Sequence, residues 1–101
     1  MKFLAIMGHE ETRPKVRDLF RQFDVLMFST MSISGCFCDK GISNQKWWPS
    51  DKGVGSYSSL CFAILEDDKA SAIMAELEKH PIALEPEFPA RAFLMNVENM
   101  V

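Results

Sequence analysis

Residues 56–65 read SYSSLCFAIL, a run whose apolar side chains alternate in direction along an extended backbone. The residues on one side of such a strand are Leu60, Phe62 and Ile64, and those on the other side are Tyr57, Cys61, Ala63 and Leu65. The pattern predicts a strand over 56–65. Because both sides of this strand are apolar, both need to be covered.

A helix pattern precedes this strand. Thr12 stands at an N-cap position, and Pro14 follows where a first helical turn tolerates proline. The apolar residues that then recur at i, i+3, i+4 and i+7 are Val16, Leu19, Phe20 and Phe23. This spacing predicts an amphipathic helix.

A second helix pattern follows the strand. Asp67 or Asp68 can cap its start, and His80-Pro81 ends it because the residue before a proline avoids the helical region. The apolar residues with helical spacing are Ala70, Ile73, Met74 and Leu77. We interpret His80 as structural, at the negative end of the helix dipole.

The remaining apolar segments predict three more strands, at 2–7, 25–34 and 90–97. A polar segment of about twenty residues, rich in Gly, Ser and Asn, separates the second and third strands, and loops of that length are usually functional. The order strand, helix, strand, strand, helix, strand predicts a ferredoxin-like α+β domain. Its sheet has four antiparallel strands, with both helices on one face.

We expect the other face of this sheet to be apolar as well. The residues assigned to it by alternation are Leu26, Phe28, Cys61, Ala63 and Leu65, joined by alternate residues of the first and last strands. Soluble monomers rarely expose an apolar surface of that extent. The pattern therefore predicts association with further copies of the chain.

Composition limits the classes of function. The 101 residues carry a formal net charge of −3 and suit one domain, residues 1–101, without an excess of cations for nucleic acid. No apolar run approaches the length of a membrane span. We expect a cytoplasmic protein that does not insert into a membrane and whose three cysteines are thiols.

Cys36 and Cys38 lie at the start of the long polar segment, on the same side if the backbone stays extended. Two thiolates can hold a soft or borderline ion such as Cu(I) or Zn(II), with Asp39, His9 or a neighbouring subunit completing the shell. The alternative is that both cysteines are small residues at the base of a loop. We interpret Cys61, in the middle of a strand, as a packing residue.

Trp47 and Trp48 stand in the same polar segment, followed by Lys52. Large aromatic side chains with a polar group are typical anchors of protein interfaces, so this region is a candidate docking loop. Burial of both tryptophans against the chain itself, or against a neighbouring copy, is the alternative. No nucleophile, metalloprotease or phosphate-loop motif occurs, and we expect no enzymatic activity.

The element order, the length and the long segment between strands two and three resemble the PII-like signalling proteins of the PII/CutA superfamily. The resemblance implies a homotrimer in which residues 36–55 correspond to the T-loop that contacts client proteins. It places effectors, often adenine nucleotides, in clefts between subunits near Gly35, Glu87 and Arg91. A branch linked to heavy-metal efflux implies a membrane transporter as the client.

The connector 80–89 has no glycine or lysine and carries Glu85 and Glu87, so we predict weak or no ATP binding. The sequence favours a non-enzymatic regulatory protein that senses an effector or metal ion between subunits and acts through residues 36–55. The alternative is a small ferredoxin-like enzyme or a metal-binding chaperone that uses Cys36, Cys38 and His9.

Overall fold

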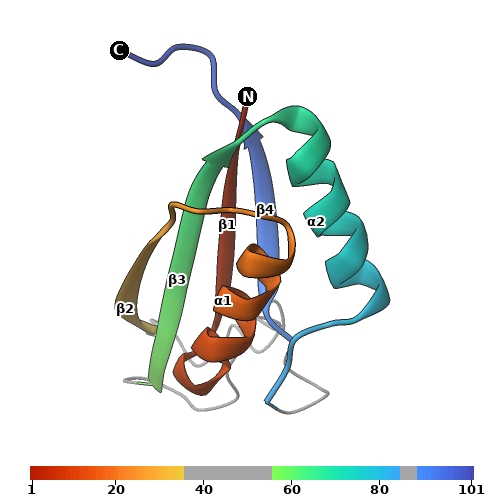
Figure 1. The fold of residues 1–101 in the computed structure, drawn as a ribbon. Helices are drawn as coiled ribbons and strands as arrows, with labels where there is room; N and C mark the ends of the chain where they lie inside the picture. The colour runs from red at the N-terminus through yellow and green to blue at the C-terminus, as the bar shows by residue number, and fades with distance from the viewer. Residues whose placement is uncertain (36–55, 85–88) are drawn as a thin grey trace, which may run out of the picture.

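A computed structural model describes residues 1–35, 56–84 and 89–101, and confirms the α+β class (Figure 1). The elements are β1 (Lys2–His9), a 3-10 turn η1 (Glu10–Thr12), α1 (Arg13–Gln22), β2 (Ser29–Gly35), β3 (Ser56–Leu65), α2 (Asp67–Lys79) and β4 (Arg91–Asn96). The strands form one antiparallel sheet in the order β2-β3-β1-β4. This is the expected ferredoxin-like arrangement.

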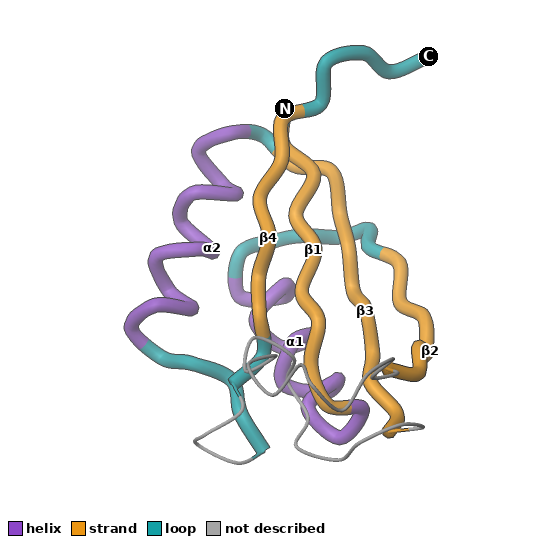
Figure 2. The backbone as a smooth tube through the Cα atoms, turned by 180° about the vertical axis from the view of Figure 1, so that it is seen from behind, coloured by secondary structure: helices purple, strands orange, loops and turns teal. Residues whose placement is uncertain are grey.

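Both helices pack on one face of the sheet (Figures 1 and 2). The core residues that the helices supply are Val16, Leu19, Phe20, Ala70 and Ile73, and those that the strands supply are Leu4, Ile6, Cys61, Ala63 and Leu65. The two predicted helical stripes therefore form the core. Burial of each large apolar side chain contributes about 1.5–3 kcal/mol, which makes this layer the main source of stability.

The predicted long connection joins two paired strands. β2 ends at Gly35, which pairs with Ser56 at the start of β3, so residues 36–55 leave and re-enter the sheet at neighbouring positions. The connector after α2 also returns on itself, because Ala83 bridges Pro89 and the amide of Ala90 donates to the carbonyl of Ile82 at 2.7 Å.

Helix α1 ends in a Schellman motif. Asp24 adopts φ of 57°, its amide donates to the carbonyl of Arg21 at 3.0 Å, and the amide of Val25 donates to that of Phe20 at 2.8 Å. Val25 and Phe20 are both buried, which supplies the apolar contact typical of this motif. Asp24 occupies the left-handed position that glycine usually fills.

The strand expected over 25–34 is wrong in its first four residues, since β2 covers only 29–35. The Schellman motif anchors Val25 in the core, and Phe28 packs on Phe20 with ring centroids 4.9 Å apart. A segment held at both ends by core contacts on the helix side cannot also continue the ladder of β2. We call residues 25–28 the arch.

Gly8 allows a close crossing between β1, the turn after it and β4. A Cβ atom at this position would lie 2.9 Å from Thr12 Oγ1 and 3.0 Å from the Cβ of Ala90. Thr12 does precede α1 as predicted, but its hydroxyl donates to the carbonyl of His9 at 2.6 Å and does not cap the helix. The threonine therefore ties the turn to the strand.

We expected Asp67 or Asp68 to be the N-cap of helix α2, but the helix begins at Asp67 itself. Glu66 holds the N-cap position without a side-chain cap, and Asp67 lies in the first turn, 3.1 Å from the amino group of Met1. A hydrogen bond from that ammonium, together with its charge, lowers the pKa of Asp67. The helix ends at Lys79, with His80 as its C-cap, as expected from the proline that follows.

Replacement of Asp24 tests the C-terminal cap of α1. We expect Asp24→Gly to raise the free energy of unfolding by up to about 1 kcal/mol, because glycine enters the left-handed region without strain. Asp24→Ala removes the same carboxylate, and we expect it to lower the free energy by about 0.5–1 kcal/mol. Urea unfolding of the three proteins measures the difference; equal stability of the two variants would contradict this account.

Candidate functional site: the open face of the sheet

Figure 2 views the sheet from the face that looks away from both helices. By cross-strand pairing, this face carries apolar residues from all four strands. Cross-strand pairing places these residues on one side: Phe3, Ala5, Met7, Met31, Ile33, Leu60, Phe62, Ile64, Phe93 and Met95. We call this set the open face. No described element covers it.

Several open-face side chains remain in contact with solvent. Met31, Ile64, Phe93 and Met95 are 40–50% exposed. Phe3 and Phe62 lie on a diagonal of the β1–β3 ladder, and their rings stack with centroids 5.3 Å apart. The result is a continuous apolar surface, because paired residues of adjacent strands place their side chains next to each other across the sheet.

The predicted apolar second face exists, but its assignment along β3 is wrong. Cys61, Ala63 and Leu65 were expected on it, and all three are instead buried under the helices. The physical reason is register, since Cys61 and Ala63 pair with Ile6 and Leu4, which lie on the face that the helices cover. Leu60, Phe62 and Ile64 then occupy the open face.

Two further residues expected there are also placed elsewhere. Phe28 packs against the core on the helix side, and Leu26 projects from the arch with 94% of its surface exposed. Both belong to the part of the expected second strand that does not join the ladder. The open face thus depends on β1, β3 and β4 together with the shortened β2.

His9 lies at the end of β1, where it caps the turn η1. Its Nδ1 accepts a hydrogen bond from the amide of Glu11 at 3.1 Å. Because Nδ1 acts as an acceptor, the neutral ring carries its hydrogen on Nε2. Metal-binding imidazoles usually donate from the nitrogen opposite the metal, so metal binding by His9 requires release of this capping bond.

Ser58 is the cross-strand partner of His9 and was not singled out by the sequence. The residue is fully buried, and its Oγ has no hydrogen-bond partner among the described residues. Serine is common where a strand begins after a polar segment, so no sequence signal distinguished this hydroxyl. It marks a polar point at the end of the open face that borders residues 36–55.

Gly35 and Arg91, both expected near an effector, lie toward the same end of the sheet but on its opposite edges. Gly35 ends β2, whereas Arg91 begins β4, where it is partly buried and pairs with Met7. Three strand spacings separate the edges by roughly 14 Å. Within one chain the structure therefore does not bring these two residues together around one small molecule.

Most of the other expected site residues lie outside the described residues. These are Cys36, Cys38, Asp39, Trp47, Trp48, Lys52 and Glu87. All except Glu87 belong to the segment between Gly35 and Ser56, whose ends are adjacent on the sheet. The segment thus begins and ends at the edge pair β2–β3, next to the row that contains Ser58 and His9.

Cys61 is a core residue, as interpreted from its mid-strand position. Its side chain is only 1% exposed, between Thr30 and Ile6 in the ladder. Burial raises the pKa of the Cys61 thiol, an effect that the charge of Arg13 partly opposes. The neutral thiol is therefore favoured, and this cysteine is neither a nucleophile nor an accessible metal ligand.

A polar contact that the sequence did not indicate fixes the edge strand β2. Arg13 donates to the hydroxyl of Ser32 at 2.9 Å, and that hydroxyl donates to Glu10 at 3.0 Å. The three groups join the start of α1 to β2 on the helix side. Because they lie 19 and 22 residues apart in the chain, no local pattern could have shown this contact.

Neither the models of known protein families nor the characterised proteins compared with the chain give a match. Within the described ranges, no helix has both the length and the apolarity to cross a bilayer. The same ranges contain no group of three or more His, Cys, Asp or Glu side chains that could hold a metal ion. We take the open face as the candidate functional site among the described residues.

Thiol reactivity tests the placement of Cys61. With Cys36→Ser and Cys38→Ser, Cys61 is the one remaining thiol, and we expect alkylation by iodoacetamide to be at least about 100-fold slower in native buffer than in denaturant. Ser71→Cys, on the exposed side of α2, supplies a control thiol that reacts quickly in both conditions. Rapid alkylation of native Cys61, measured by mass spectrometry, would show that the strand is not packed as described.

Proposed function

We propose that the protein is a non-enzymatic regulatory protein of the PII-like type, which acts as a homo-oligomer with its open face buried between copies. The observation that carries this proposal is the apolar surface formed in register by all four strands. The open face spans roughly 300–400 Å² in projection, from strand spacing and rise. A patch of this size is comparable with the largest apolar patches of monomeric proteins, which commonly mark contact sites.

A trimer is the assembly that the PII-like resemblance implies. In this proposal residues 36–55 contact a client protein through Trp47, Trp48 and Lys52, and the protein is cytoplasmic with a membrane transporter as candidate client. The pairing of Gly35 with Ser56 supports it, since a segment anchored at both ends can report a ligand-dependent change without disturbing the sheet.

Effector binding is proposed at clefts between copies, with Gly35, Glu87 and Arg91 as contact residues. The separation of Gly35 from Arg91 across the sheet supports a shared cleft, because one small molecule can meet both only if a neighbouring copy supplies one of them. The effector class stays open between a metal ion and a small anion, with adenine nucleotides disfavoured by the acidic connector.

A metal branch of the proposal assigns Cys36, Cys38 and Asp39 as ligands for Zn(II) or Cu(I). Thiolates suit both ions, and the capping bond of His9 makes donors of a second copy the simpler completion of the site. Cys61 does not take part, since it is buried in the core. Binding of metal at the base of residues 36–55 would bias their arrangement.

A charge on the open face tests the oligomer. We expect Phe93→Asp to convert the protein into an 11.5 kDa monomer at micromolar concentration, because a carboxylate cannot be buried unpaired in an apolar interface. Leu84→Asp is the matched control, since Leu84 is also a half-exposed apolar residue but lies outside the sheet. Sedimentation velocity measures both; a wild-type protein that sediments as a single chain would overturn the proposal.

Thiol protection tests the metal branch. We expect Zn(II) or Cu(I) to slow alkylation of Cys36 and Cys38 in the wild-type protein, while Cys61 serves as an internal control that is unreactive with or without metal. Peptide mapping by mass spectrometry separates the three thiols. If both cysteines react at the same rate after addition of metal, the metal branch fails while the oligomer is unaffected.

A further inference from the structure

Among the described residues, the arch carries the most exposed large apolar side chains outside the chain ends. Leu26 is 94% exposed and Met27 is 86% exposed. Adjacent apolar side chains with so little cover are unusual on a soluble domain, and such patches commonly mark contact sites. The two residues therefore need an explanation beyond the packing of one chain.

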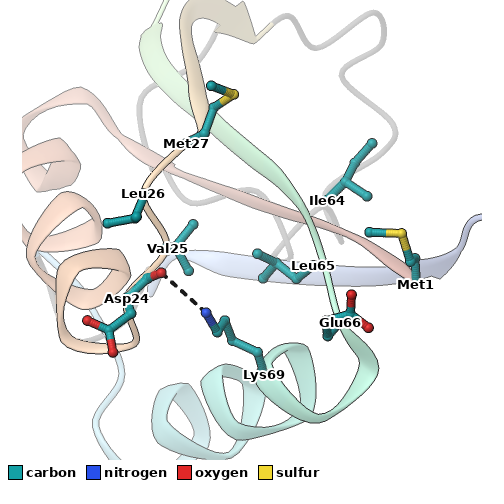
Figure 3. Close-up of a pocket in the computed structure, with 9 residues that line it drawn as sticks. All are labelled: Met1, Asp24, Val25, Leu26, Met27, Ile64, Leu65, Glu66 and Lys69. Carbon is teal, nitrogen blue, oxygen red and sulfur yellow. Dashed lines mark hydrogen bonds between the residues drawn. The ribbon is translucent and has the colours of Figure 1, made fainter.

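The arch is held firmly although its tip is exposed. Val25 is 5% exposed, and its amide bonds to the carbonyl of Phe20. At the other end, Phe28 packs on the ring of Phe20. Lys69 Nζ also donates to the backbone carbonyl of Asp24 at 3.2 Å (Figure 3). Both ends of the arch are fixed in the single chain. A partner that binds Leu26 and Met27 therefore orders little further backbone, and the conformational-entropy cost of binding is small.

The arch adjoins the open face. A depression of about 300 Å³ lies beside it, and its lining includes Leu26, Met27, Met1 and Ile64. Ile64 is also an open-face residue, paired with Phe3. Figure 3 shows Met27 and Ile64 on the side of the depression opposite Lys69. One apolar surface therefore runs from the sheet around the end of β3 to the tip of the arch.

We propose that the arch of one copy packs on the open face of the next copy, so that each contact between copies joins two different surfaces of the chain. This inference rests on the proposed oligomer and names its contact residues. The area supports it, because a ring built in this way covers both the arch and the open face of every copy, whereas the open face alone spans roughly 300–400 Å². A symmetric contact between open faces would leave Leu26 and Met27 in water.

The charges around the two surfaces are compatible with this contact. The lining beside the arch carries the carboxylates of Asp24 and Glu66 and the ammonium group of Lys69. Arg91, which pairs with Met7 at the end of the open face, is a cation, so the two carboxylates can face it across the contact. A contact between two different surfaces forms a ring when the rotation between copies closes, as in a trimer.

The direct test removes the apolar tip. We expect Leu26→Ser combined with Met27→Ser to raise the dissociation constant of the oligomer at least about tenfold, because apolar side chains at a contact centre carry much of the affinity. Both side chains are solvent-exposed in the single chain, so the far-UV circular dichroism spectrum should not change. Leu84→Asp again serves as the control, and sedimentation across a concentration series gives the constant.

A mixing experiment distinguishes this contact from a symmetric one. The arch variant keeps an intact open face, and Phe93→Asp keeps an intact arch. We expect each variant alone to be monomeric at a concentration where an equimolar mixture forms a two-chain species. In the mixture, the intact arch of the Phe93→Asp chain can pack on the intact open face of the arch variant. A contact between two identical faces gives no such complementation.

The outcomes separate the two proposals. If the wild-type protein is monomeric, the oligomer fails and this inference fails with it. If Phe93→Asp dissociates a wild-type oligomer while the double serine variant leaves the dissociation constant unchanged, the oligomer stands and the arch is not part of it. Absence of a two-chain species in the mixture, with both variants monomeric alone, overturns the contact between arch and face.

Discussion

Alternation of side chains along β1 and β3 is the constraint on which the structure depends. The two strands form the centre of the sheet, and each is apolar on both sides. Two helices can cover only one face of a four-stranded sheet of this connectivity. The second face is covered by none of the described elements, and its apolar character favours contact with a further surface over contact with water.

Element types were well predicted because the signals are local. The apolar stripe from Val16 to Phe23 has the period of a helix, and the alternation over 56–65 has the period of a strand. Both patterns correctly predicted the observed elements. Boundaries were weaker where tertiary contacts compete with propensity. Residues 25–28 alternate like a strand, yet the anchoring of Val25 by the end of α1 withdraws them from the ladder.

The apolar second face was also predictable, but the side of β3 that forms it was not. Alternation gives two sets of residues without indicating which set meets the helices. The choice depends on the register with β1, which places Cys61 and Ala63 beside Ile6 and Leu4 in the core and Phe62 on the other face. The capping role of His9 likewise depends on a backbone conformation that the residue type does not reveal. Most of the expected metal and docking residues lie in 36–55, beyond the described ranges.

The crossing at Gly8 has a consequence for how sequences with this fold can diverge. The missing side chain leaves room for the hydroxyl of Thr12 and the methyl group of Ala90, which come from separate parts of the chain. A larger residue at any one of these positions needs a smaller one at another. Positions 8, 12 and 90 should therefore covary as a set of conserved total volume, and this triplet offers a way to recognise distant homologues whose surfaces have changed completely.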